Sequence, residues 1–429
     1  MEVALPMMAL VVLICIGMPI AYALGVTGAV GAAMAIGWIP TLGVLQTTPY
    51  RTAANFLLST IPLFILMAEL LARSSIVANL YRMCFLWIGH VRGGLALAAV
   101  VASTGFAALA GSSTAAAAAM ARISVPEMRK YGYDDRLAVG TVAVAGTLSI
   151  MIPPSMGLIM YGVLTETSIG SLFIAGVIPG VLTAIAYATV ILVWVKRRPE
   201  IAPAAPKASR QARMASILPV WPAAILVCLV LGGIYSGAIT ATEAAAVGAA
   251  GALVIGLGWG GLGRKEFGVA LRHTLRSTAM IFAIIIGAMI FGYFLAATRA
   301  PQNLIDWVGT LPLPPWGILL VIIGIYLLLG FFIDQLAIII LTLPLTFPLV
   351  MSLGYDPIWF GIIITKTAEI GLVTPPLGMN VFVASAAANT KVEVGFKGVM
   401  PFLVGEVIVL GLLIALPELS LYLPGLVAY

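Results

Sequence analysis

The stretch Ile152-Pro153-Pro154-Ser155 interrupts an apolar segment near its middle, and Thr374-Pro375-Pro376-Leu377 interrupts a second segment in the same way. Two consecutive prolines remove two backbone donors and push the preceding residue out of helical geometry. The carbonyls one turn earlier, near Ser149 and Gly371, therefore need other partners. A desolvated cation held by these carbonyls and by nearby hydroxyl groups would satisfy them, and a purely structural kink is the alternative. We expect two broken helices, each beside a polar site.

Both breaks belong to an internal repeat with a constant offset of 222 residues. Pro153-Pro154 matches Pro375-Pro376, and Tyr133 matches Tyr355 (355 − 133 = 222) within a shared Gly-Tyr-Asp tripeptide. The matches fall on Gly, Pro, Tyr and Asp, which an apolar composition does not produce by chance. The same offset relates Pro126 to Pro348, and Gly176, Val177 and Pro179 to Gly398, Val399 and Pro401.

The composition predicts a membrane protein. Of the 429 residues, 62% are hydrophobic and 9% are charged, whereas a soluble domain carries about 25% charged residues. This composition excludes a soluble fold, a nucleic-acid-binding protein and a disordered chain. We expect the chain to be surrounded by the lipid bilayer. The three cysteines lie far apart in apolar runs, which indicates neither a disulfide framework nor a metal site.

At about 20 apolar residues per crossing, the chain has room for ten spans. The N-terminus lacks a basic region, so we expect a true first span rather than a cleaved signal peptide. The expected spans are 4–24, 25–45, 57–73, 137–164, 172–195, 217–236, 238–262, 277–298, 358–389 and 399–425.

The basic residues predict the orientation. Nineteen of the 22 lie in four groups, at 73–136, 196–213, 264–276 and 391–397. If all four groups are cytoplasmic, both termini are periplasmic. Stretch 93–128 must then begin and end inside, and stretch 317–350 must begin and end outside. We expect both to be re-entrant hairpins, ordinary spans being the alternative.

The first hairpin has a turn-prone tip at Gly111-Ser112-Ser113-Thr114. Its arm 115–128 covers about 21 Å at 1.5 Å per residue, too short for a hydrocarbon core of about 30 Å. Hairpins that enter from opposite sides make the two repeats inverted, an architecture typical of secondary transporters.

The expected fold is an all-α polytopic membrane protein of two inverted repeats, with about ten crossings, two re-entrant hairpins and two Pro-Pro-broken helices. The first repeat (1–195) contains spans 4–73, hairpin 93–128, broken helix 137–164 and span 172–195. Residues 196–216 form a basic cytoplasmic linker. The second repeat (217–429) contains spans 217–298, hairpin 317–350, broken helix 358–389 and span 399–425.

Polar residues accompany each break and each hairpin tip. Oxygen ligands suit a hard cation, and ionisable residues within spans are functional candidates. Asp334 of the second tip aligns with Ser112, while Lys366 and Glu369 lie three residues apart and could pair on one helical face. A structural ion pair is the alternative for these two. Glu69, Glu243 and Glu406 are weaker candidates.

We expect that this protein is not an enzyme. The chain has no Walker-type lysine loop, no Gly-x-Ser-x-Gly and no His-Glu-x-x-His motif.

Four motifs carry a family resemblance: Ala110-Gly111-Ser112-Ser113-Thr114-Ala115, Lys130-Tyr131-Gly132-Tyr133-Asp134, Ile152-Pro153-Pro154-Ser155, and Gly371-Leu372-Val373-Thr374-Pro375-Pro376-Leu377-Gly378-Met379-Asn380. With these motifs the sequence resembles the large, DctM-like membrane subunit of TRAP (tripartite ATP-independent periplasmic) transporters. The resemblance covers nearly the whole chain and is weakest at the linker and the C-terminus.

The resemblance implies sodium-coupled import of a small organic acid, of the C4-dicarboxylate, sialic acid or keto-acid class, across the bacterial inner membrane. It implies a periplasmic substrate-binding protein and a small four-helix membrane subunit, expected as a separate chain because this one starts with the first span. It also implies a scaffold and an elevator-type transport domain. Na+ is the only ion that we expect, and we expect no organic cofactor.

By this analogy, each tip and its break hold one sodium ion, with substrate between them. The sodium-binding residues are expected to be Gly111, Ser112, Ser113, Ser149, Pro153, Ser155, Asp334, Gly371, Thr374 and Pro375. The substrate-binding residues are expected to be Ser113, Asn380, Lys366 and Glu369. The rival functions are a stand-alone ion-coupled anion transporter of related architecture and a channel.

Overall fold

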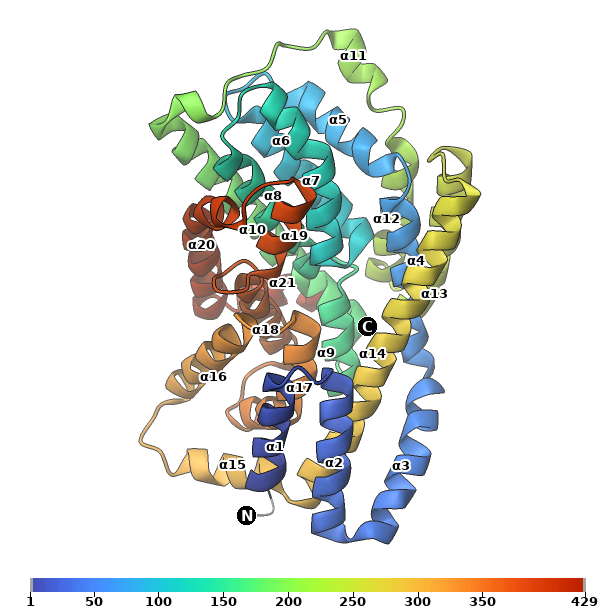
Figure 1. Ribbon diagram of the computed structural model, residues 1–429, viewed down its shortest axis with the longest axis vertical. Helices are drawn as coiled ribbons and strands as arrows, with labels where there is room; N and C mark the ends of the chain where they lie inside the picture. The colour runs from blue at the N-terminus through green and yellow to red at the C-terminus, as the bar shows by residue number, and fades with distance from the viewer. Residues whose placement is uncertain (1–2, 427–429) are drawn as a thin grey trace.

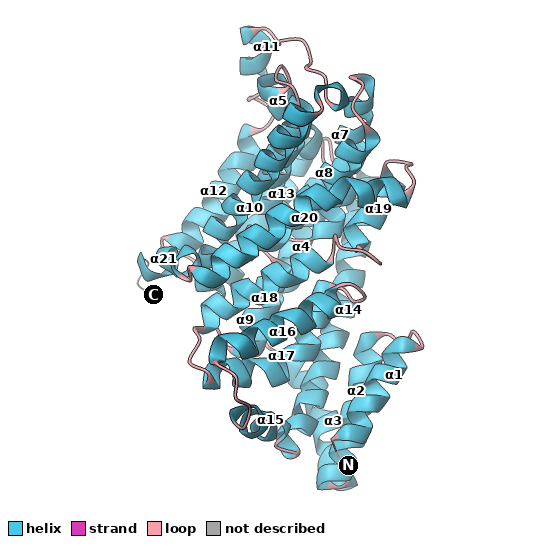
Figure 2. Ribbon diagram, turned by 90° about the vertical axis from the view of Figure 1, so that its left-hand side faces the viewer, coloured by secondary structure: helices cyan, strands magenta, loops and turns pink. Residues whose placement is uncertain are grey.

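The computed structural model describes residues 3–426, and these residues form helices without a strand (Figure 2). The prediction of an all-α protein is therefore confirmed for the described residues. The first half contains α1 (Ala4–Cys15), α2 (Ile20–Ile36), α3 (Trp38–Ala53), η1 (Phe56–Ser59), α4 (Thr60–Ala72), α5 (Ile76–Ile88), α6 (Gly94–Ala110), α7 (Ser113–Lys130), α8 (Asp135–Met151), α9 (Met156–Thr165) and α10 (Ile169–Arg197).

The linker carries η2 (Pro199–Ile201) and α11 (Arg210–Ala215). The second half contains α12 (Trp221–Tyr235), α13 (Ala241–Gly258), α14 (Arg264–Ala297), α15 (Ala300–Gly309), α16 (Pro315–Gly330), α17 (Gln335–Ser352), α18 (Pro357–Gly371), α19 (Met379–Ala387), α20 (Val392–Ala415) and α21 (Glu418–Leu426).

The helices of the two halves correspond in order. The helices α7 and α17 begin 222 residues apart, as do α8 and α18. Asp134 and Asp356 precede α8 and α18, and each carboxylate accepts a hydrogen bond from the backbone N–H two residues later, as N-cap residues do. The corresponding elements α3–α4 and α14 run in opposite directions, α3–α4 rising and α14 descending in Figure 1.

The halves also pack across one another. The helix α2 packs on α14, and α13 packs on α4; likewise α7 contacts α19, and α17 contacts α9. At the α2–α14 contact, a Cβ on Gly28 would lie 2.6 Å from the Cα of Phe291. A glycine is therefore needed for this approach. Each half completes the packing of the other.

The centre of the molecule is formed by α8 and α18. Residues 137–151 of α8 and 359–371 of α18 are all buried. The helix α8 ends two residues before Pro153, and α18 ends four residues before Pro375. Both Pro-Pro bonds are cis. The breaks therefore begin at the centre of the fold.

Each predicted hairpin consists of two helices joined by a short turn. The helices α6 and α7 meet at Gly111 and Ser112, where Gly111 has a left-handed φ of +61° that suits glycine. The helices α16 and α17 meet at residues 331–334. That the hairpins are re-entrant stays a prediction.

Three predicted span boundaries are wrong. Range 4–24 is broken at residues 16–19, range 25–45 at Gly37, and range 399–425 at residues 416–417. Gly17 and Gly37 have φ values of +87° and +86°, and Pro19 and Pro417 lack the N–H needed to continue a helix. The apolar composition conceals these breaks. The helices α5 and α15 were not predicted.

Six helices in the described part of the chain are long and apolar enough to cross a membrane: the broken helix 135–165 and helices α10, α13, α14, α17 and α20. The pair α3–α4, bent by 52°, would be a seventh if it forms one span. Ten crossings stay a prediction. The termini, residues 1–2 and 427–429, lie outside the described residues.

Candidate functional site

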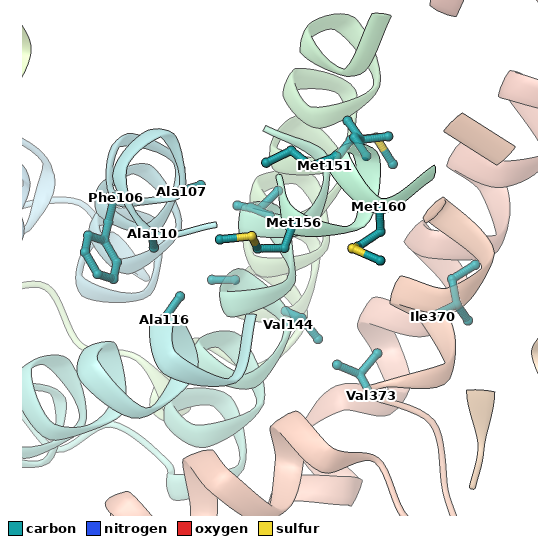
Figure 3. Close-up of a cluster of buried hydrophobic side chains, with 14 of the residues drawn as sticks. Phe106, Ala107, Ala110, Ala116, Val144, Met151, Met156, Met160, Ile370 and Val373 are labelled. Carbon is teal, nitrogen blue, oxygen red and sulfur yellow. The ribbon is translucent and has the colours of Figure 1, made fainter. Parts of the chain in front are cut away.

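The first hairpin tip rests directly on the first break. A Cβ on Gly111 would lie 2.9 Å from the carbonyl oxygen of Pro154, and the N–H of Met156 points to the Gly111 oxygen at 3.5 Å. Figure 3 shows Met156 extending toward Ala110 of this hairpin. The predicted proximity of tip and break is therefore present, and irregular backbone from two segments meets in the core.

Three serines lie next to this junction in the sequence: Ser112 follows Gly111, Ser155 follows Pro154, and Ser149 lies four residues before Pro153. Ser155 precedes α9, and its Oγ accepts a hydrogen bond from the N–H of Leu158 at 3.3 Å. Ser149 donates to the Gly146 oxygen at 2.8 Å, and the Ser112 Oγ lies 3.4 Å from that of Thr114. Carbonyl and hydroxyl oxygens of this kind are ligands for a hard cation.

The first tip also reaches the second broken helix. The Ser113 hydroxyl donates to Asn380 Oδ1 at 3.3 Å, and Asn380 Nδ2 donates to the Ala143 oxygen at 3.4 Å. Both side chains are buried. Two of the residues predicted to bind substrate are thus brought together from opposite halves of the chain.

The second hairpin meets the second break through glycines. A Cβ on Gly371 would lie 2.6 Å from the Cα of Gly330. Asp334 precedes α17 and accepts a hydrogen bond from the Leu336 N–H at 3.1 Å, while Thr374 donates to the Ile370 oxygen at 2.6 Å. The hairpin and the break are neighbours here, and Asp334 and Thr374 each bond within their own segment.

The tip of the second hairpin faces the first broken helix. Gln335 is 6% exposed, and its Nε2 has no hydrogen-bond partner in the described structure. This nitrogen occupies the space that a Cβ on Gly157 of α9 would take. The sequence indicated Gln335, beside Asp334, as a polar residue of the second tip, but Gln335 was not among the expected site residues.

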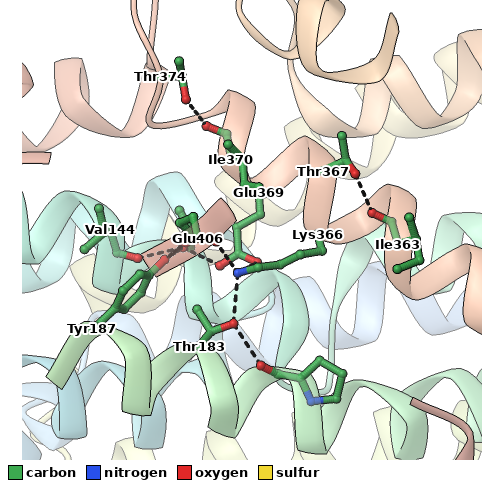
Figure 4. A network of polar contacts seen from close by, with 12 residues as sticks. Val144, Thr183, Tyr187, Ile363, Lys366, Thr367, Glu369, Ile370, Thr374 and Glu406 are labelled. Carbon is green, nitrogen blue, oxygen red and sulfur yellow. Dashed lines mark hydrogen bonds and ion pairs between the residues drawn. The ribbon is translucent and has the colours of Figure 1, made fainter. Parts of the chain in front are cut away.

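A cluster of buried charges lies between the halves (Figure 4). We call the side chains of Lys366, Glu369 and Glu406 the charge cluster; all three are 0% exposed. The Lys366 ammonium is 3.1 Å from Glu369 Oε2 and also pairs with Glu406. It donates to the Thr183 hydroxyl at 2.9 Å. The ion pair between Lys366 and Glu369, weighed above as the structural alternative, is present.

Two side chains from the first half, Thr147 and Tyr187, satisfy the carboxylates. Thr147 donates to Glu369 Oε1 at 2.6 Å and lies 2.9 Å from the Tyr187 hydroxyl, which in turn bonds Glu406. Every charged group thus has a partner, as buried charges require. The sequence indicated Lys366 and Glu369, ranked Glu406 low, and gave no signal for Thr147, Thr183 or Tyr187.

This closed arrangement bears on the substrate role predicted for Lys366 and Glu369. Their charged groups are committed to one another and to buried partners, with no exposed surface for a ligand. Gln335 is better placed for that role, because its Nε2 has no hydrogen-bond partner in the described structure. A direct substrate contact of Lys366 or Glu369 stays a prediction.

Two neighbouring cavities adjoin α14. The larger, about 900 Å³, is lined by residues of α3, the α9–α10 turn, α13 and α14, including Arg51 and Glu166. The smaller, about 370 Å³, lies between α9, α14 and α17. Met289 and Tyr293 of α14 line both. Cavities therefore separate α14 from the second half of the first broken helix.

Comparison with known proteins identifies the relatives of this chain. The family described as "Tripartite ATP-independent periplasmic transporter, DctM component" matches residues 7–419. The C4-dicarboxylate TRAP transporter large permease protein DctM of Pseudomonas aeruginosa is 38% identical over 377 residues, 88% of each chain. The sialic acid large permease SiaM of Vibrio cholerae is 34% identical over 373 residues, 87% of each. Further relatives are named for ectoine and isethionate.

The fold is also similar to a solved structure. The YdaH transporter of Alcanivorax borkumensis superposes with a TM-score of 0.65 over 89% of each chain, at 15% sequence identity. At this identity the likeness concerns the fold alone. The helical arrangement described here is therefore one that a transporter adopts.

Proposed function

This chain belongs to the DctM component family of tripartite ATP-independent periplasmic transporters and is a multi-pass membrane protein, and we propose that it is the large permease of a sodium-coupled importer of a small organic acid. Its relatives are named for C4-dicarboxylate, sialic acid, ectoine and isethionate. The first two are organic acids, and we assign this chain to the class of C4-dicarboxylates, sialic acids and keto acids.

The observation that carries the sodium proposal is the contact between Gly111 and Pro154. It joins a hairpin tip to a broken helix at a buried junction where Ser112, Ser149 and Ser155 supply oxygen atoms. A desolvated cation is stabilised by such oxygens. The corresponding region of the second half would use Asp334, Gly371, Thr374 and the Pro375 segment.

Substrate would bind between these two regions. Ser113 and Asn380 bridge the halves there, and the free Nε2 of Gln335 could donate to a carboxylate of the substrate. The hydrogen-bond donors of these side chains and the sodium ions at the two adjacent sites would together offset the negative charge of an organic acid.

Movement would take the form of an elevator. The hairpins and broken helices would form the transport domain, and α1–α4 with α12–α14 would form the scaffold. The cavities between α14 and α9 support this division, because they mark a boundary with little packing. The polar helix breaks can then move within a transport domain that itself supplies hydrogen-bond partners for their backbone groups.

The proposed assembly has two partners, and its location is the bacterial inner membrane. A periplasmic binding protein would deliver substrate, and a small four-helix membrane subunit, as a separate chain, would cover the exposed apolar side chains of the scaffold. Leu5, Tyr22 and Ile39 are examples of such exposed residues.

The test is substrate uptake into proteoliposomes that contain this chain with its small subunit, at a series of sodium concentrations. We expect uptake to require both a sodium gradient and the loaded binding protein. S113A and D334A should raise the half-saturating sodium concentration while expression and folding stay normal. An unchanged value in both variants would reject the sodium sites. Uptake without the binding protein would favour a stand-alone transporter, and flux that needs neither sodium nor the binding protein would favour a channel.

A further inference from the structure

One hydrogen bond joins the two broken helices next to both breaks. The Thr147 hydroxyl on α8 donates to Glu369 Oε1 on α18 at 2.6 Å. Thr147 lies two residues before Ser149, and Glu369 lies two residues before Gly371. In each helix, two residues correspond to about 3 Å along the axis. The bond therefore lies close to the ends of both helices, where the Gly371 carbonyl accepts a hydrogen bond from the Thr374 N–H at 3.2 Å.

The two bonded residues occupy equivalent positions in the repeat. Their separation (369 − 147 = 222) is the offset that relates the halves. Two equivalent positions can touch only near the axis that exchanges the halves. The bond therefore lies at the same position relative to each of the two breaks. A displacement of the end of one helix is passed to the end of the other helix through this single contact.

The bond is held firmly on both sides. The Thr147 hydroxyl has a single proton and also faces the Val144 carbonyl at 2.7 Å and the Tyr187 hydroxyl at 2.9 Å, but a carboxylate is the stronger acceptor. The other Glu369 oxygen is fixed by Lys366, which is fixed in turn by Thr183 and Glu406. All of these side chains are 0% exposed. They are shielded from bulk solvent, and the packed core leaves little room for independent movement.

We propose that the Thr147–Glu369 bond couples the two sodium sites, so that the ions bind with positive cooperativity. The inference rests on the proposed function, because it needs an ion at each break. An ion at the first break sets the position of the end of α8 and of Thr147. Through the bond it also sets the position of Glu369 and the end of α18, so the second ion meets a site that is already in its ion-bound geometry. By linkage the effect is reciprocal.

The experiment is equilibrium binding of ²²Na+ to the purified full-length chain in nanodiscs, which requires no substrate. Wild-type protein should bind with a Hill coefficient above one and below its ceiling of two, the number of sites. T147V removes the hydroxyl and keeps the shape, and its Hill coefficient should fall to about one while binding capacity is kept. T147S restores a hydroxyl and should restore cooperativity.

T183V is the matched control. It makes the same change at another threonine that bonds the charge cluster, and it removes a bond to Lys366 from α10, which carries neither break. Its cooperativity should equal that of the wild type. A purely structural role of Thr147 would lower binding capacity equally in T147V and T183V and leave the Hill coefficients alike. That result, or a cooperative T147V, overturns the coupling and leaves the sodium sites intact. Absence of saturable ²²Na+ binding in the wild type refutes the proposed sodium sites themselves.

Discussion

Replacing Lys366 by methionine isolates the role of the one cation in the charge cluster. Methionine keeps the apolar length of the side chain and removes the ammonium that pairs with Glu369 at 3.1 Å and with Glu406. Both carboxylates stay buried and lose their shared counter-charge. Only Thr147 and Tyr187 remain as their hydrogen-bond partners.

The expected loss of stability is large. Removing one partner of a fully buried ion pair costs about 3–5 kcal/mol, because the remaining charge is left uncompensated. At about 1.4 kcal/mol per factor of ten, the ratio of folded to unfolded protein falls by roughly a hundred-fold to a few thousand-fold. The triple variant K366M/E369Q/E406Q removes all three charges and should recover most of this loss, since neutral replacements of buried ion pairs are often tolerated.

The measurement is the half-life of folded protein in detergent at fixed elevated temperatures, because membrane proteins commonly unfold irreversibly. K130M provides the matched control. Lys130 pairs with Glu127 at 2.7 Å, but the two side chains are 66% and 38% exposed, so the change should cost less than about 1 kcal/mol. If K366M is as long-lived as K130M, Lys366 does not compensate the buried carboxylates and the reasoning is refuted.

Three further predictions concern the helix contact, the topology and the moving boundary. G371A places a methyl group against the backbone of Gly330 and should cost about 1–3 kcal/mol, measured as thermal half-life, whereas G324A on α16 meets open space and should be neutral or stabilising. In a variant without native cysteines, A208C should react with an impermeant thiol reagent only after the cells are permeabilised; labelling of intact cells would overturn the cytoplasmic linker. Cysteines at Thr165 and Gly292, which line the smaller cavity from α9 and α14, should block uptake when joined by a cleavable crosslinker and allow it after cleavage. Full uptake by quantitatively crosslinked protein would exclude movement at this boundary.

The landmarks of the repeat could be identified from the sequence because each depends only on neighbouring residues of the chain. Gly, Pro and Asp act on their own backbone, so the Pro-Pro stretches, the Gly111 turn and the two Gly-Tyr-Asp tripeptides could be found without knowing any partner. The structure adds that Asp134 and Asp356 cap helices. The helix breaks at Gly17 and Gly37 rest on the same chemistry. They were missed because glycine is common in membrane helices and only its φ value distinguishes a break from close packing.

Contacts between the halves could not be predicted in this way. Lys366 and Glu369 are neighbours on one helix face, which the spacing of three residues indicates. Glu406 joins them only because α20 packs beside α8 and α18. The same holds for Thr147, which bonds Glu369 of the opposite half, and for Gln335, which lies against Gly157 of the opposite half. The sequence around a threonine or glutamine in an apolar segment does not indicate which residue of the other half it will contact.

The crossing of the halves has a consequence for how the protein is made. Ser113 and Asn380 are 267 residues apart, and ribosomes add about 5–20 residues per second. Once the first hairpin has left the ribosome, between about a quarter of a minute and a minute passes before its partner is synthesised. During that interval α7 has no α19 to pack on, and the Ser113 hydroxyl lacks its acceptor. A nascent chain halted before α19 therefore presents a polar tip without a partner, which gives membrane quality control a feature by which to recognise unfinished copies.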